Sequence, residues 1–310
     1  MRLIKTEDAV GHVLCHDMTQ IIKDQYKDAR FRKGHVVTEE DIPVLLSMGK
    51  EHLYVWEMTP GMVHENDAAE RLLALCGQEN MIRSGVKEGK IELKAACDGV
   101  FLVDSARLVA VNSQDEVMIA TRKGGTAVRE GDKLAGMRVI PLIIEEEKLR
   151  KAEQAAGDKP LLSLKPYVRK TACIVATGGE VKKGLIKDTF TPVVIDKLKT
   201  YGIETLEVVY SGDGVENVRD AVLAMREKKP DMILCTGGMS VDPDDNTPGG
   251  IKAAGANIIA YGAPVLPGAM FLLGYFDDGM PVMGLPGCVM YAGATVFDLV
   301  LPKIAADVPV

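Results

Sequence analysis

One pattern repeats through the second half of this 310-residue chain: a short apolar run ends in a glycine-bearing turn, and a segment with helical periodicity follows. The apolar runs, which we expect to be strands, are 171–177, 204–210, 231–235 and 282–285. The helical segments are 188–201, 215–228, 251–254 and 291–302. Because the runs are apolar on both sides, we expect a three-layer α/β domain over 161–310, a mostly parallel sheet with helices on both faces.

Residues 1–160 have a different pattern and predict a smaller α+β region. Helices are expected over 41–48, 64–77 and 145–156, and strands near 10–22 and over 52–56. A β-rich module, barrel-like or a meander, is expected over 90–144, with strands at 91–96, 100–103, 108–111, 117–120 and 137–144. Gly157-Asp158-Lys159-Pro160 breaks the last helix and predicts a linker between two domains.

Charge and composition exclude several classes of function. The net charge is −7 and aromatic residues make up only 5% of the chain, so we expect no nucleic-acid partner. No uncharged apolar stretch reaches membrane-spanning length, and the start of the chain carries no signal-peptide pattern. The six cysteines form no Cys-x-x-Cys pair, which favours reduced thiols. We therefore expect a cytoplasmic protein without a membrane partner.

Three glycine-bearing turns follow predicted strands, at the edge where open α/β sheets bind ligands. They are Thr177-Gly178-Gly179-Glu180, Thr236-Gly237-Gly238-Met239-Ser240 and Gly284-Leu285-Pro286-Gly287. Turns without side chains let backbone N–H groups approach an anion closely. The three turns together predict a site for a ligand that carries phosphate or carboxylate groups.

Acidic residues follow the second turn, in Asp242-Pro243-Asp244-Asp245. Carboxylates this close repel one another unless something positive lies among them. The cluster therefore predicts a site for a divalent cation or for a pterin-like ring with N–H donors, with a solvated acidic loop as the alternative. Asp188 and Asp213 follow other strands, where they either join the site or cap helices. All five histidines precede residue 65, which argues against His-driven nucleophilic hydrolysis in the glycine-rich domain.

The order and spacing of these motifs resemble the molybdopterin-binding domain shared by molybdopterin adenylyltransferases and molybdopterin molybdenumtransferases. The resemblance covers roughly 168–306 and includes Pro267-Gly268 and Asp245 at matching places. Asp242 stands where the family pattern has Gly, and Cys288-Val289 where it has Asn-Pro. The chain thus resembles a short, divergent branch of this family.

This resemblance implies molybdopterin or its adenylate as the ligand, with Mg²⁺ as a companion cation. The ligand-binding residues it implies are Thr177, Gly178, Gly179, Thr236, Gly237, Gly238, Ser240, Pro267, Gly268, Pro286, Gly287 and Cys288. Asp245, Glu180 and Asp213 would act in catalysis, and Asp242 and Asp245 would hold the metal.

Two functions follow from the resemblance. The first is a transferase of molybdenum cofactor biosynthesis, at the adenylylation or the molybdate-insertion step. The second is a non-catalytic carrier or sensor of the cofactor for a molybdenum hydroxylase, which the departures at 242 and 288–289 favour. Without the resemblance, binding of some other phosphorylated metabolite stays open. We expect a homo-oligomer, a dimer in preference to a trimer, and a molybdoenzyme as partner.

Overall fold

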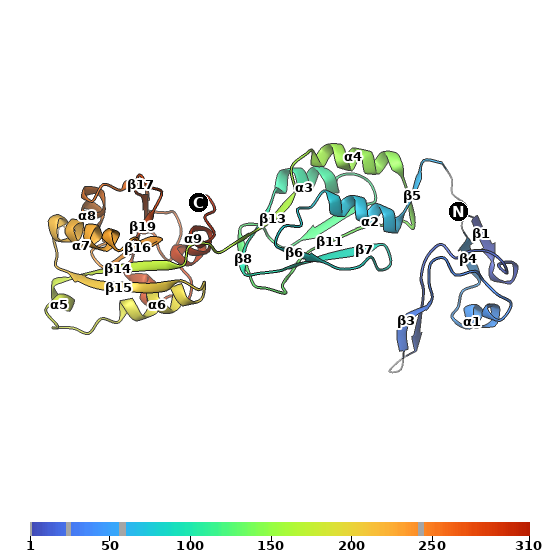
Figure 1. Ribbon diagram of the computed structural model, residues 1–310, viewed down its shortest axis with the longest axis horizontal. Coiled ribbons are helices and arrows are strands. Elements are labelled where there is room, and N and C mark those ends of the chain that lie inside the picture. The colour runs from blue at the N-terminus through green and yellow to red at the C-terminus, as the bar shows by residue number, and fades with distance from the viewer. Residues whose placement is uncertain (1, 23–25, 56–59, 241–244) are drawn as a thin grey trace. The chain divides into compact units, whose positions relative to one another are not determined.

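The computed structural model describes residues 2–22, 26–55, 60–240 and 245–310 (Figure 1). The chain forms two compact units. The N-terminal unit comprises the described residues of 1–96, 103–124 and 131–163. The C-terminal unit comprises the described residues of 97–102, 125–130 and 164–310.

The C-terminal unit is built on a six-stranded sheet in the order β15-β14-β16-β19-β18-β17. Its strands are Thr171–Thr177 (β14), Glu204–Ser211 (β15), Met232–Thr236 (β16), Asn257–Tyr261 (β17), Leu272–Tyr275 (β18) and Pro281–Leu285 (β19). The first four strands in this order are parallel, whereas β18 is antiparallel to β19 and β17 is antiparallel to β18 at one edge. This confirms the predicted mostly parallel α/β sheet.

Helices cover both faces of this sheet. They are Gly179–Lys182 (α5), Phe190–Lys199 (α6), Val215–Glu227 (α7), Thr247–Ala253 (α8) and Val296–Ala305 (α9), with a 3-10 turn at Gly287–Met290 (η2). Ile174 of β14 is buried in one core with α6 and α9, and Val175 in another core with α7 and α8. The central strands are therefore apolar without alternation because each face meets a helix layer.

A three-stranded sheet accompanies this unit, in the order β10-β8-β13. Its strands are Gly99–Val103 (β8), Thr126–Val128 (β10) and Leu162–Pro166 (β13). Val100 is buried in the core that contains Phe297 of α9, and the Tyr167 hydroxyl donates to the Gly99 carbonyl at 3.1 Å. Residues 97–102 and 125–130, which the sequence division assigned to the N-terminal region, therefore lie in the C-terminal unit.

The first part of the N-terminal unit has a small core of its own, which includes Leu14, Phe31, Leu45 and Leu53. Its elements are Arg2–Lys5 (β1), Thr6–Asp8 (η1), Met18–Ile22 (β2), Tyr26–Phe31 (β3), Asp41–Ser47 (α1) and His52–Val55 (β4). β1 pairs with β4, and β2 pairs with β3.

The rest of the N-terminal unit is a four-stranded antiparallel sheet, β6-β7-β11-β9, with helices on one face (Figure 1). The strands are Met81–Arg83 (β6), Lys90–Ala95 (β7), Val117–Thr121 (β9) and Lys133–Val139 (β11). The helices are Glu65–Ala74 (α2), Ser105–Asn112 (α3) and Glu146–Ala156 (α4). Met62–His64 (β5) pairs with Ile143–Glu145 (β12).

Several predicted elements are wrong in detail. The expected strand at 108–111 is part of α3, because Asp104 caps this helix by accepting from the Arg107 N–H at 3.1 Å and Leu108 and Val111 share its buried face. The expected strand at 137–144 is divided between β11 and β12, and the strand near 10–22 is confined to β2. The 90–144 module is an open sheet covered by helices rather than a barrel or a simple meander.

The last helix begins later than residue 291. A capping box places its start at Val296, since Thr295 and Asp298 satisfy each other's backbone N–H groups. No helix in the described parts of the chain has the length and apolar character needed to cross a membrane.

Candidate functional site

A hollow of about 450 Å³ lies at the carboxyl ends of β16 and β19. It brings together three of the predicted motifs from separate parts of the chain. The predicted residues that line it are Gly237, Gly238, Ser240, Asp245, Pro267, Gly268, Pro286, Gly287 and Cys288. We refer to this hollow as the strand-end pocket.

Two glycines of the strand-end pocket have conformations that a side chain would disrupt. Gly237 has a φ of +82°, and a Cβ there would overlap the carbonyl oxygen of Thr177. Gly238 has a φ of +58°, and a Cβ there would lie 2.6 Å from Thr247 Oγ1. The Gly-Gly pair is therefore required for the turn to bend this closely against the neighbouring strand.

Threonine hydroxyls fix the base of the same turn. Thr177 Oγ1 donates to the Thr236 carbonyl at 2.9 Å, and Thr247 Oγ1 donates to the Gly237 carbonyl at 2.9 Å. The two hydroxyl oxygens are 3.2 Å apart. Thr177 and Thr236 therefore lie behind the turn as supports, outside the lining of the pocket.

The electrostatics of the strand-end pocket depend on its backbone. Among the described residues that line it, none is Lys, Arg or His, and Asp245 is the one acid. The N–H groups of Gly238, Met239, Gly287 and Cys288 donate to no acceptor within the described residues. Such N–H groups are the donors that bind anions at glycine-rich turns.

Asp245 shapes the pocket through its carboxylate. Its Oδ2 accepts a hydrogen bond from the Ser240 N–H at 3.0 Å, which closes the turn after Gly238. Burial, together with the negative charge of Asp245, raises the pKa of Tyr261, whose hydroxyl donates to the Met239 carbonyl at 3.2 Å. Asp242, the other predicted metal ligand, lies outside the described residues. Within the described residues, no group of three or more His, Cys, Asp or Glu side chains could hold a metal ion.

The other two predicted catalytic carboxylates lie after β14 and β15, outside the lining of the strand-end pocket. Asp213 Oδ2 accepts from the Gly179 N–H at 3.0 Å and so holds the start of α5, which also carries Glu180. Gly178 and Gly179 belong to this neighbouring turn. Asp188 Oδ1 accepts from the N–H groups of Phe190 and Thr191, which makes Asp188 a helix cap.

The six cysteines divide by burial. Cys288 is partly exposed at the pocket, whereas Cys76 and Cys235 are buried and their burial raises each thiol pKa to about 12. A thiol with so high a pKa is almost entirely protonated near neutral pH and unreactive. Cys288 is therefore the thiol that could meet a ligand in this pocket.

Some lining residues were missed by sequence reasoning. Leu266, Met239, Ala269 and Met270 also line the strand-end pocket. The side chain of Met239 packs against Gly284, where a Cβ would lie only 2.6 Å from Met239 Sδ. The absence of a side chain at Gly284 therefore leaves room for Met239. The motif Gly284-Leu285-Pro286-Gly287 indicated that the backbone is approached closely here. It did not indicate that Met239 makes this approach, because one sequence does not show which distant residues are in contact.

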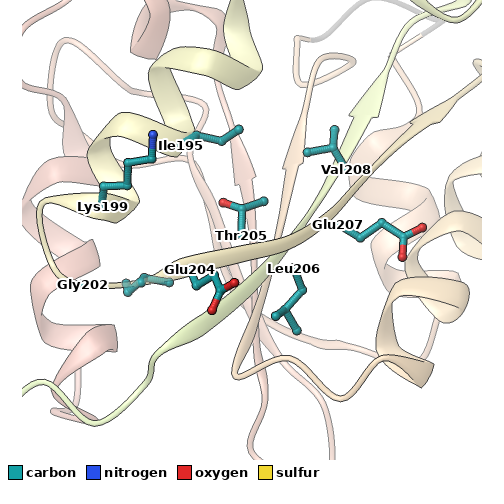
Figure 2. A pocket seen from close by; sticks show the side chains of 9 residues that line it. Ile195, Lys199, Gly202, Glu204, Thr205, Leu206, Glu207 and Val208 are labelled. Atoms are coloured by element: carbon teal, nitrogen blue, oxygen red, sulfur yellow. The ribbon is translucent and has the colours of Figure 1, made fainter.

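A larger hollow, of about 610 Å³, lies beside the edge strand β15 (Figure 2). Ile195 and Lys199 of α6 line it on one side, and Glu204 and Glu207 of β15 also belong to it. It follows the first half of β15 and the preceding turn, whereas ligands of α/β sheets bind beyond the carboxyl ends of strands. Its carboxylates also oppose an anionic ligand, so we place the candidate site in the smaller strand-end pocket.

Most of the C-terminal unit is similar to a known family. Residues 173–306 match the family model described as "Probable molybdopterin binding domain". This match, over less than half of the chain, makes these residues similar to the molybdopterin-binding domain family. Residues 3–57 match a second family model, described as a domain of unknown function.

Known proteins resemble parts of the chain. A CinA-like protein of Mycobacterium tuberculosis is 33% identical over 76 residues, and one of Petrotoga mobilis is 32% identical over 76 residues. Each match covers 24% of this chain and 18% or 19% of the relative, so the chain spans less than a fifth of these relatives. Among solved structures, the molybdopterin biosynthesis enzyme MoaB of Thermus thermophilus aligns with a TM-score of 0.38 at 17% identity, covering 45% of this chain and 98% of that one. The Mog protein of Mycobacterium ulcerans aligns with a TM-score of 0.36 at 21% identity, with the same coverage.

Proposed function

We propose that the strand-end pocket binds molybdopterin or its adenylate and that the protein acts in molybdenum cofactor biosynthesis. The observation that carries the proposal is the convergence of Gly238, Asp245 and Gly287 in one pocket within the molybdopterin-binding domain. The phosphate would lie on the N–H groups of Gly238 and Met239, and the pterin ring between this turn and Pro286.

The transferase chemistry would depend on positioning and charge neutralisation. In adenylylation, a phosphate oxygen of molybdopterin attacks the α-phosphorus of ATP, and pyrophosphate leaves. In molybdate insertion, a water oxygen attacks the phosphoanhydride bond of the adenylate, so that the molybdopterin phosphate is regenerated and AMP leaves. Neither step needs a protein nucleophile, so the chain's part would be to hold the reacting groups in line.

A Mg²⁺ ion fits this pocket only as a partner of the substrate. Asp245 is the single carboxylate among the described lining residues, and one of its oxygens already accepts from the Ser240 N–H. Mg²⁺ commonly takes one or two protein carboxylates and fills its coordination with phosphate oxygens and water. We therefore propose that Asp245 holds the ion against the bound phosphates, with Asp242 as the second ligand.

The carrier function is the second candidate, and one observation favours it. Of the three carboxylates expected to act in catalysis, Glu180 and Asp213 lie outside the lining of the strand-end pocket, and Asp213 is engaged in holding α5. A carrier needs the phosphate-binding turn but not these groups. Cytoplasmic location, a dimer and a molybdoenzyme partner stay predictions that belong to either function.

One assay distinguishes the two candidates. The full chain is incubated with molybdopterin, ATP and Mg²⁺, or with the adenylate and molybdate, and bound pterin, pyrophosphate and AMP are measured. Pterin binding with release of pyrophosphate or AMP supports the transferase. Pterin binding without either product supports the carrier, and absence of pterin binding contradicts both.

A further inference from the structure

The four-stranded sheet of the N-terminal unit has a second face that its helices do not cover. α2 contacts β7 and β11, and α3 and α4 contact β9, all on one side (Figure 1). Along β7, Ile91 and Leu93 are buried beneath these helices, whereas Lys90 and Lys94 alternate with them and are exposed. We call the exposed side the open sheet face.

The open sheet face contains a hollow of about 320 Å³ with mostly cationic walls. Four cationic side chains line it: Lys90, Arg122, Lys133 and Arg138. Glu92 is the one acid in the lining. This excess of positive charge stands out because the whole chain has a net charge of −7.

Cross-strand pairing increases this charge concentration. Lys133 lies directly opposite Lys94 in the β7–β11 ladder, and Arg138 lies opposite Lys90. Like charges directly opposite each other destabilise a sheet, so stability alone does not account for this placement. Cations kept together on one sheet face are the arrangement that an anionic ligand requires.

Glu92 lies between the cations and partly neutralises them. Its carboxylate is 2.5 Å from Lys90 Nζ and 3.3 Å from Lys133 Nζ, and both lysines lower the pKa of Glu92 through hydrogen bonds and charge. Arg122 pairs with Asp132 at the border of the hollow. Glu92 therefore occupies the position that a ligand's negative group would take between the two lysines.

The floor of the hollow is apolar. Met118 and Ala120 of β9 are exposed there, beside Gly136 of β11. A side chain at Gly136 would project from the middle of this floor, where a Cβ would lie 3.4 Å from Lys90 Cε. The absence of a side chain at Gly136 leaves room for a planar or compact apolar group between the charged walls.

We propose that the open sheet face is a second ligand site, which binds a small organic phosphate. Its phosphate groups lie between Lys90 and Lys133 and displace Glu92, and its apolar part lies on Met118 and Ala120. The site is formed entirely within the N-terminal unit and does not depend on the function of the strand-end pocket.

Binding of inorganic pyrophosphate and of ADP to the full chain, measured by calorimetry, tests this proposal. The double variant Lys90→Gln/Lys133→Gln removes the cations, and we expect it to raise the Kd for both probes about tenfold or more. Glu92→Gln removes the competing carboxylate, so we expect it to lower the Kd. ADP should bind more tightly than pyrophosphate, because only ADP has an apolar part for the floor.

Two controls match the changes in net charge. The double variant Arg150→Gln/Lys151→Gln and the single variant Glu147→Gln alter exposed positions of α4, which covers the opposite face of the sheet. We expect each control to keep the Kd within about twofold of wild type, because the altered charges are distant and screened. If the controls change binding as much as the sheet variants, or if Glu92→Gln weakens binding, the proposal is overturned. It is also overturned if neither probe binds the wild type, or if both probes bind the double variant as tightly as they bind the wild type.

Discussion

The strand-end pocket of the C-terminal unit and the open sheet face of the N-terminal unit use different chemistry toward anions. The strand-end pocket has no cation among its described lining residues and depends on N–H groups of glycine-bearing turns. The open sheet face has four cationic side chains and a single acid. An acidic chain can thus accommodate anions either through its backbone or through local clustering of side-chain charge.

The two kinds of anion site should respond differently to substitution. Backbone donors are fixed by the turn, so a steric change abolishes the site while a charge change elsewhere has little effect. Side-chain cations are mobile and partly screened, so single substitutions there should have graded effects. Substitutions in the strand-end pocket should therefore have the largest effects, and substitutions on the open sheet face the smallest.

Substitution Gly237→Ala should have the largest effect, reducing pterin affinity roughly a hundredfold because the turn is forced out of position. The φ of +82° is unfavourable for alanine, and the new Cβ overlaps the Thr177 carbonyl. The measurement is the Kd for molybdopterin. Gly255→Ala is the matched control, since Gly255 has a φ of +91° but nothing within 4 Å. Equal effects of the two variants on binding would show that the turn does not form the site.

Substitution Asp245→Asn should reduce the Mg²⁺-dependent part of pterin affinity about tenfold. Asparagine keeps an oxygen that can accept from the Ser240 N–H, so the turn is retained while the charge is lost. Titrations with and without Mg²⁺ measure the difference. Asp220→Asn, at a position on α7 away from the pocket lining, is the control. An Asp245→Asn protein that binds and reacts like wild type would remove Asp245 from the site.

Cysteine labelling should show a moderate protection of the pocket thiol, Cys288, by the ligand. At pH 8, iodoacetamide should modify Cys288, whereas Cys76 and Cys235, each with a pKa raised to about 12 by burial, stay protonated and shielded. Raising the pH toward 12 increases their thiolate fraction. Peptide mass spectrometry follows each site. Molybdopterin should slow modification of Cys288 but not of the partly exposed Cys97; protection of neither cysteine would contradict ligand binding beside Cys288.

The smallest expected effect is a gain in stability at the open sheet face. Lys94→Gln relieves the repulsion from Lys133 and should raise the free energy of unfolding of the sheet by about 0.5 kcal/mol. Hydrogen exchange at amides of β7 and β11 measures this locally. High salt should reduce the gain, because it screens the repulsion in the wild type. A lower free energy of unfolding in Lys94→Gln would show that the two opposed lysines do not destabilise the sheet.

Much of the C-terminal unit could be predicted from periodicity. The run Thr171–Thr177 is β14 with the same bounds. The helix predicted over 215–228 is α7, which ends one residue earlier, at Glu227. By contrast, the strand predicted over Leu108–Val111 is part of a helix. A run of only four apolar and small residues fits the periodicity of a helix as well as that of a strand. The Asp104 cap and the burial of one helical face decided in favour of a helix.

The sequence by itself determined the parallel α/β architecture and the positions of the glycine turns, because both follow from local patterns of side-chain size and polarity. The tertiary structure decided which motifs share a pocket. Strand order places the turns after β14 and β19 on either side of the turn after β16. The turns after β16 and β19 line the pocket, whereas Glu180, in the turn after β14, lies outside the lining. It also decided that lysines from β7 and β11 face each other, since the register of an antiparallel pair depends on contacts between residues far apart in the chain.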